Sequence, residues 1–187
     1  MRFDRARFEA RSGNARHRNR RADVIFSNTA MKNFEDFRIS FLIPENWRVT
    51  EDESNNLIFA DPRDKSFWCS IEFSGLKART SDNPLPSAKF VLASCFEKEL
   101  ALKTGVLIEL KDGRAMIEWP ETVEHQGGQY LVHHFQVAAP AISGDVQLAN
   151  FCLTIPLPVQ DQAEIDGLKV LVRQQAVSAK FKEWRKS

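Results

Sequence analysis

Cysteine is scarce in this chain of 187 residues, and its spacing gives no sign of disulfide or metal cross-links. The three cysteines are Cys69, Cys95 and Cys152, an odd number placed far apart in the sequence. No pair has the Cys-x-x-Cys spacing, so the pattern excludes a zinc ribbon and a disulfide framework. Unpaired cysteines are typical of a reducing compartment, which predicts a cytoplasmic protein.

Long apolar runs are also missing, as are segments rich in glycine or proline. The longest apolar stretches are far shorter than the roughly 20 residues that a membrane-spanning helix needs. Glycine and proline number eight each, while 43% of the residues are hydrophobic and 27% are charged. These values exclude a collagen, a coiled coil and a wholly disordered chain. The length suits one domain with a tail, and such a domain can bury a proper core without disulfides.

Acidic residues are rare in the first 21 positions, where eight arginines face only Asp4 and Glu9. This segment therefore carries a formal net charge of +6. Because the whole chain carries +1, the rest of the chain carries −5. Three interpretations fit: an arm for nucleic-acid phosphates, a targeting presequence, or a disordered leader without function. We favour the last, with a basic, disordered leader at residues 1–30 and one folded domain at residues 31–187. Met31 is then a candidate start of the native protein, and nucleic-acid binding is disfavoured.

Apolar and polar residues alternate in several segments, which is the pattern of strands with one buried face. Short polar turns, such as the one at Asp112-Gly113, join neighbouring segments and favour antiparallel hairpins. Strands are predicted at residues 37–43, 57–60, 67–73, 106–110, 115–119, 130–137 and 145–155. We expect the first three to form an antiparallel meander. The aromatic residues expected in the core are Phe37, Phe41, Phe67, Phe73, Phe96 and Phe135.

Two further segments have the period of an amphipathic helix. Residues 87–103 place an apolar stripe on one side, with Ser87 as the N-cap and Gly105 as the residue that ends the helix. A second helix begins at Asp161, an N-cap acid, and its apolar stripe continues to Trp184. Strands joined by hairpins and covered by two helices predict an α+β fold: a layered sandwich with a mainly antiparallel sheet and two principal amphipathic helices.

Recognisable catalytic and metal-binding motifs are absent, including phosphate-binding glycine loops, Gly-x-Ser-x-Gly and His-Glu-x-x-His. His133 and His134 are adjacent in a strand and point to opposite faces, so they do not hold one metal ion together. His125 and His133 could oppose each other across a hairpin, but further ligands are not suggested. We therefore predict no metal site, no cofactor and no catalytic residue.

The remaining nucleophiles and acids have plainer interpretations. Cys69 and Cys95 fall on apolar stripes and are expected to be buried, and Cys152 lies within a strand. Three acids near Trp119-Pro120 could form a paired-carboxylate site, although an exposed strand end is the commoner reason for such a group. They are Glu118, Glu121 and Glu124.

Trp68, Tyr130 and His134 share an orientation that sets them apart from the core residues of their strands. Trp68 points away from Phe67 and Cys69, and Tyr130 and His134 point away from the apolar side of their strand. If a helix leaves this face partly uncovered, the three form an exposed aromatic patch suited to binding a protein. If a helix covers it, they belong to the core.

The segment Ile39-Ser40-Phe41-Leu42-Ile43-Pro44-Glu45-Asn46-Trp47 resembles the opening of the PsbP-like superfamily, an apolar strand followed by Pro-x-x-Trp. This superfamily includes the Ran-binding Mog proteins, many small bacterial proteins and type VI effector-associated chaperones. The resemblance extends over residues 36–182. It implies structural roles for Pro44, which ends the strand, and for Trp47, which packs beneath the turn. It supplies no catalytic residues, and the basic leader departs from it.

The sequence therefore leads to two main hypotheses of different classes. The first is a non-catalytic, protein-binding adaptor or chaperone-like protein of bacterial origin. Its partner would be another protein, with a secreted effector as one option and a homodimer as another. The alternative is a small-molecule-binding protein or an enzyme with a pocket between sheet and helix, near His133 or Cys95.

Overall fold

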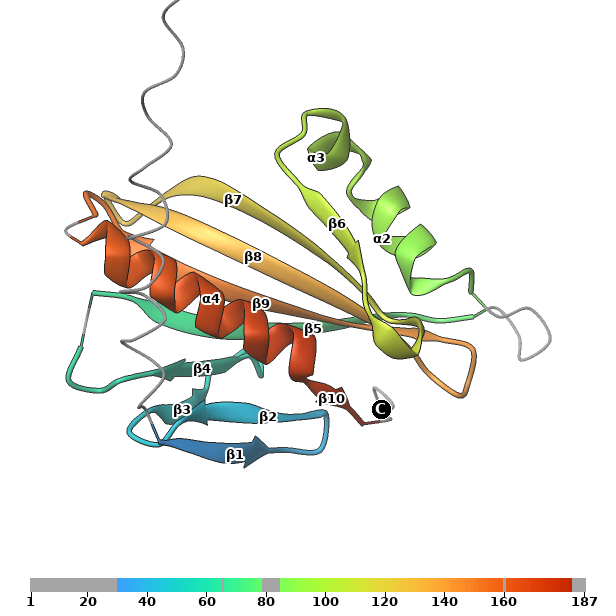
Figure 1. Ribbon diagram of the computed structural model, residues 1–187, viewed down its shortest axis with the longest axis horizontal. Coiled ribbons are helices and arrows are strands. Elements are labelled where there is room, and N and C mark those ends of the chain that lie inside the picture. The colour runs from blue at the N-terminus through green and yellow to red at the C-terminus, as the bar shows by residue number, and fades with distance from the viewer. Residues whose placement is uncertain (1–29, 65, 79–84, 160, 183–187) are drawn as a thin grey trace, which may run out of the picture.

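Two antiparallel sheets and three α-helices build the described part of the protein in this computed structural model (Figure 1). The structure describes residues 30–64, 66–78, 85–159 and 161–182, so nearly all of the predicted leader lies outside the described residues. The elements are β1 (Met31–Glu35), β2 (Ile39–Pro44), β3 (Arg48–Glu51), β4 (Leu57–Ala60), β5 (Trp68–Leu76), α2 (Ala88–Cys95), α3 (Glu97–Ala101), β6 (Val106–Glu109), the short 3₁₀ turn η1 (Lys111–Gly113), β7 (Ala115–His125), β8 (Gly128–Pro140), β9 (Val146–Pro156), α4 (Gln162–Ser178) and β10 (Lys180–Phe181).

The larger sheet has the strand order β3-β4-β5-β9-β8-β7-β6, and the smaller has the order β1-β2-β10. All strand pairs are antiparallel, and the predicted hairpins β4–β5, β6–β7 and β7–β8 are confirmed. The predicted meander of the first three strands is wrong, because β2 pairs with β1 and β10 and leaves β4 and β5 to the larger sheet. Strand β2 instead packs across the larger sheet, which buries Ile39, Phe41 and Ile43 almost completely.

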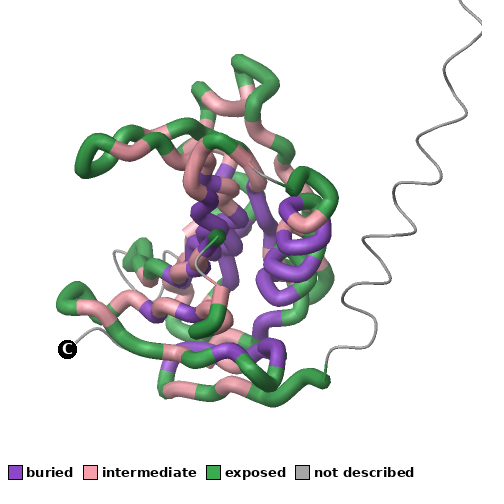
Figure 2. The backbone as a smooth tube through the Cα atoms, turned by 90° about the vertical axis from the view of Figure 1, so that its left-hand side faces the viewer, coloured by how far each residue is buried: buried purple, intermediate pink, exposed green. Residues whose placement is uncertain are grey.

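Alternation along β7, β8 and β9 gives the larger sheet two different faces. On one face, Phe135, Val137 and Phe151 pack in the main core with α4 and the smaller sheet. On the other face, Ile117 and Ala138 pack with α2. Figure 1 shows α4 crossing the larger sheet and α2 at its far end, and Figure 2 shows the buried segments gathered between the exposed rims. The predicted α+β sandwich with two principal helices is confirmed.

Aromatic rings join the two sheets across the core. The Phe41 ring from the smaller sheet lies 5.6 Å from that of Phe151 and 5.7 Å from that of Phe59. The Trp47 ring lies 5.7 Å from Phe59 and 5.6 Å from Phe67, and Trp47 is buried beneath the turn that follows β2. Pro44 is the last residue of β2. The structural roles expected for Pro44 and Trp47 are thus confirmed.

The helix predicted at residues 87–103 is present but divided into α2 and α3. Ser87 caps it as expected, since its Oγ accepts a hydrogen bond from the Phe90 amide. Phe96 leaves the helical conformation at φ −121° and ψ 34°, and its ring packs on Trp119. Gly105 does not provide the left-handed residue after the helix, because Lys103 adopts φ 56° instead. Gly105 is needed for space: a Cβ there would lie 3.2 Å from both Glu99 and Ile117.

The C-terminal helix begins as predicted and ends earlier. The Asp161 side chain accepts hydrogen bonds from the amides of Ala163 and Glu164, which caps α4. The helix ends at Ser178, and Phe181 belongs to β10, where it pairs with Ile39 of the smaller sheet. The extension of the helical stripe to Phe181 is therefore wrong, because pairing with β2 replaces helical hydrogen bonds there. Trp184 lies outside the described residues.

Phe37 and Phe41 test the core, because the sequence alone treats them as equivalent. Phe37 is 68% exposed in the turn between β1 and β2, so its predicted core position is wrong; the chain turns before the alternation begins. We expect Phe41→Ala to lower the free energy of unfolding by about 3–5 kcal/mol through the cavity it leaves. Phe37→Ala should lower the free energy of unfolding by no more than about 1 kcal/mol, because it removes the contact of this exposed ring with Arg38. Urea unfolding of both variants measures the difference, and equal costs would contradict the described core.

Candidate functional site

Helix α2 covers only part of its face of the larger sheet. It packs against β6, β7 and β8, and no described helix packs extensively on β5. We call the remaining part the open face. It is formed by Trp68, Ser70 and Glu72 of β5, Asn150, Cys152 and Thr154 of β9, Tyr130, Val132, His134 and Gln136 of β8, and Trp119 and Glu121 of β7.

Two ring pairs lie on the open face. The rings of Trp68 and Tyr130 meet edge to face at 5.4 Å, and the His134 ring stacks on Trp119 at 4.5 Å with an angle of 7°. Trp68, Tyr130 and His134 thus share one face, as expected, and all three are half-buried. Trp119 was missing from the predicted set. Its place in the alternation of β7 could have indicated it, but only the register shows that it lies opposite His134.

Hydrogen bonds fix the His134 ring on both sides. Its Nε2 lies 3.1 Å from Glu121 Oε1, and since a carboxylate only accepts, Nε2 carries the proton. Its Nδ1 lies 3.1 Å from the Asn150 amide nitrogen and 3.4 Å from Cys152 Sγ, both of which can donate to it. A thiol, an imidazole and a carboxylate therefore converge, and no spacing in the sequence indicates this.

This cluster is poorly suited to nucleophilic catalysis. Burial, followed by the negative charge of Glu72, raises the pKa of Cys152 to about 12, so the thiol stays protonated at neutral pH. Cys152 is only 4% exposed, and β9 lies between β5 and β8, where the sheet ladders use its backbone amides. A developing oxyanion would find no backbone donors there. The arrangement instead holds the His134 ring in one orientation.

A row of amide side chains crosses the open face beside this cluster. Asn150 lies opposite Gln136 on β8 and opposite Glu72 on β5. Asn150 and Gln136 are both buried, and the Oδ1 atom of Asn150 has no hydrogen-bond partner among the described residues. A buried acceptor without a partner costs free energy, so this position favours a bound group that donates a hydrogen bond.

The other predicted chemical groups are dispersed. His125 pairs with Gly128 in the β7–β8 hairpin and His133 with Pro120, so the two histidines do not oppose each other. Glu118 points to the α4 side, where it pairs with Arg173, whereas Glu121 lies on the open face. Within the described ranges, no group of three potential ligands could hold a metal ion.

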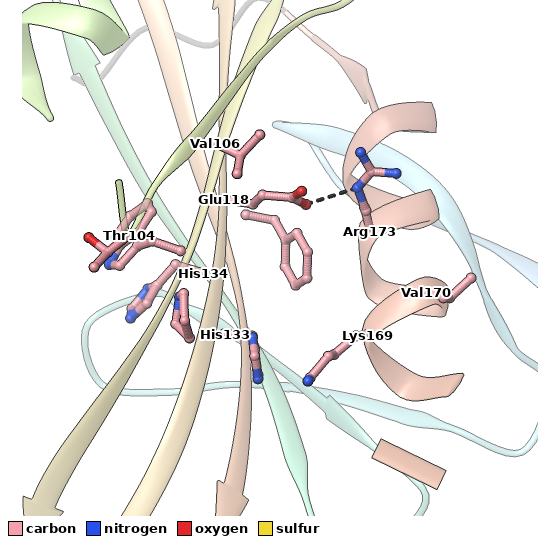
Figure 3. Close-up of a pocket in the computed structure, with 11 residues that line it drawn as sticks. Thr104, Val106, Glu118, His133, His134, Lys169, Val170 and Arg173 are labelled. Atoms are coloured by element: carbon pink, nitrogen blue, oxygen red, sulfur yellow. Dashed lines mark hydrogen bonds and ion pairs between the residues drawn. The ribbon is translucent and has the colours of Figure 1, made fainter. Parts of the chain in front are cut away.

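A pocket does lie between the larger sheet and α4, near His133, as the small-molecule hypothesis requires (Figure 3). It has a volume of about 300 Å³, and His133 lines it from β8 while Lys169 lines it from α4. The helices that the structure describes include none long and apolar enough to cross a membrane.

Comparisons with known proteins show a similarity of fold and nothing further. No family model matches the sequence, and no curated protein matches it. A crystal structure from Bacteroides thetaiotaomicron has a TM-score of 0.52 and 13% identity over 81% of this chain. The match covers 48% of that protein, so this chain spans about half of its length.

Two further solved structures are similar over most of their own length. LpqN, described as involved in cell envelope biogenesis of Mycobacterium tuberculosis, has a TM-score of 0.51 and 16% identity, covering 87% of this chain and 96% of LpqN. Cyanobacterial PsbP (CyanoP) from Synechocystis has a TM-score of 0.41 and 16% identity, covering 82% of this chain and 93% of CyanoP. The likeness to LpqN and to the Bacteroides protein shows a shared fold. Links to Mog proteins and effector chaperones stay predictions.

The cysteines should differ sharply in reactivity. Cys69 is fully buried, and burial raises its pKa. Cys95 is exposed at the end of α2, so its predicted burial is wrong. The reason is that the helix breaks at Phe96, which ends the apolar stripe there. We expect an aromatic disulfide reagent to modify Cys95 alone in the native protein and all three cysteines after unfolding. Thiol titration with Cys95→Ser as the control measures this. Rapid native modification of Cys152 would contradict its buried, protonated state.

His133 should make stability depend on pH. Burial, together with the charges of Lys169 and His134, lowers its pKa from 6.5 to about 4. Between pH 4 and pH 6.5, His133 therefore binds a proton in the unfolded chain but not in the folded protein. The free energy of unfolding should therefore fall as pH drops from 6.5 to 4, by on the order of 2 kcal/mol for this partly exposed group. In urea titrations, the difference between wild type and His133→Leu should change across this range. A constant difference would contradict the assignment.

Proposed function

We propose that this chain is a non-catalytic, protein-binding adaptor of chaperone-like type that holds a segment of its partner on the open face. One observation carries the proposal: Trp68, Tyr130 and His134 lie half-buried on a part of the sheet against which no described helix packs extensively, while Trp119, on which His134 stacks, is partly covered by Phe96. Tryptophan and tyrosine are the side chains most often found as energetic anchors of protein interfaces. Unpaired cysteines in the described core support a cytoplasmic location for this activity.

The size of the open face favours a segment over a whole folded partner. Four strands at about 4.8 Å spacing span roughly 14 Å, and the seven positions from Tyr130 to Gln136 span roughly 20 Å. This is a few hundred Å², well below the roughly 800 Å² per partner of a standard stable interface. An extended segment of a few residues fits it, and binding through it alone would be weak or transient.

The chemistry of the open face indicates what that segment carries. Glu72 and Glu121 add negative charge at its borders, and Asn150 presents an acceptor without a partner. Apolar side chains would contact the two ring pairs, while lysine, arginine or hydroxyl groups would donate to the carboxylates and to Asn150. We therefore propose a partner segment that alternates apolar with basic or hydroxyl-bearing residues.

A pull-down with the full chain, followed by binding measurements on the recovered partner, tests this proposal. The double variant Trp68→Ala/Tyr130→Ala should raise Kd by about 30-fold or more, since truncation of one interface anchor costs about 2 kcal/mol. Phe90→Ala is the matched control, because Phe90 is 61% exposed on α2, outside the open face. It should leave Kd unchanged.

Two results would contradict the proposal. One is a partner that the wild type and the double variant bind equally well. The other is recovery of no partner together with turnover of a small substrate. A self-associating chain whose dimer is lost in the double variant would identify a second copy as the occupant, and sedimentation of wild type against variant detects this.

A further inference from the structure

The pocket beneath α4 lies mainly on the face of the larger sheet opposite to the open face, and Trp119 and His134 of the open face also line it. Its floor is formed by β6, β7 and β8, and its wall by α4 (Figure 3). Phe135 and Pro120 contribute apolar surface from the sheet, and Val106 and Val170 lie at its two sides. Val106 is 53% and Val170 is 47% exposed, so two β-branched side chains beside the cavity present apolar surface to solvent. A volume of about 300 Å³ is at the small end of ligand sites.

The polar groups of the pocket leave one cation and one ring nitrogen available. Arg173 and Glu118 neutralise each other through a 2.8 Å contact between Nε and Oε2. Lys169 has only a long contact of 3.4 Å with Asp166. His133 Nε2 is buried and has no hydrogen-bond partner among the described residues. Figure 3 shows the ends of His133 and Lys169 pointing toward each other across the pocket.

We propose that this pocket binds a small monocarboxylate with an apolar body, held by its carboxylate between Lys169 Nζ and His133 Nε2. A carboxylate supplies the acceptors that an ammonium group and a ring N–H both need, and it gives the buried Nε2 a partner. The apolar body would lie on Phe135 and cover Val106 and Val170. At neutral pH His133 is uncharged, so it contributes a single N–H while Lys169 contributes the charge.

Charge balance favours an anion over a cation or a neutral ligand. The charged residues that line the pocket are Lys169, Arg173 and Glu118, which together carry one positive charge, and Asp166 lies outside the lining at 3.4 Å from Lys169. A cationic ligand would face Lys169 directly, and a neutral one would add no counter-charge to the ammonium group beyond Asp166, whose carboxylate lies 3.4 Å away. A dicarboxylate would bury its second charge against Phe135.

Isothermal titration of the full chain with octanoate tests the proposal, with 1-octanol as the neutral probe of the same chain length. We expect one octanoate per chain, bound at least ten-fold more tightly than octanol. Lys169→Met should reduce octanoate affinity at least ten-fold and leave octanol unchanged. Lys111→Met is the control, because it removes the same charge from the exposed turn η1 and should change neither.

A second measurement locates the site independently of affinity. Octanoate should shift the NMR signals of the His133 ring and the Val170 methyl groups and leave those of Tyr130 on the open face unchanged. Absence of octanoate binding, equal affinity for octanol, or shifts confined to the open face would each overturn the proposal. The Trp68→Ala/Tyr130→Ala variant should bind octanoate normally, so failure of this site and failure of the proposed protein-binding function are distinguishable.

Discussion

The central strands of the larger sheet are longer than the helices available to cover them, and this mismatch determines where the surface is left open. Strand β8 has 13 residues and extends about 43 Å at about 3.3 Å per residue. Helix α4 has 17 residues but rises only about 1.5 Å per residue, roughly 26 Å, and α2 with eight residues spans about 12 Å. Both faces of β8 carry apolar and aromatic side chains, so each helix leaves part of its own face uncovered. The open face lies beyond α2, and the pocket lies beside α4.

Strand geometry then places two adjacent histidines in unlike surroundings. His133 and His134 differ by one residue and so point to opposite faces of β8. His134 is held by Glu121 and Asn150 and stacked on Trp119, so every polar atom of its ring has a partner. His133 faces α4, where its Nε2 lacks a partner and Lys169 lies across the pocket. The satisfied ring is suited to a fixed docking surface, whereas the unsatisfied one is suited to a ligand that completes its hydrogen bonds.

Local patterns in the sequence predicted most of the fold because alternation, turn residues and helix caps are local signals. The hairpins, both caps and the common face of Trp68, Tyr130 and His134 follow from them. The separate smaller sheet does not, since it depends on contacts between distant segments. Arg38 illustrates this: it is buried, and it joins Asp36 to Glu51 and lies 4.3 Å from the Phe73 ring. No spacing in the sequence indicates that a charged residue between two apolar ones will link β2 to β3 and β5. Phe37 and Cys95 were misplaced for the converse reason, because each continues a local pattern at the end of an element. Phe37 lies two residues before β2 begins, and Cys95 is the last residue of α2.

The partners of His134 were beyond prediction for a more specific reason: they come from β7 and β9, and their meeting depends on cross-strand register. A shift of one residue in either pairing would move Glu121 or Asn150 to the α4 side and separate the cluster. The same register makes the open face and the pocket two sides of one rigid element. Strand β8 is hydrogen-bonded to β7 and β9 along almost its whole length. Two residues, Trp119 and His134, belong to the open face and also line the pocket, so the two sites share part of β7 and β8.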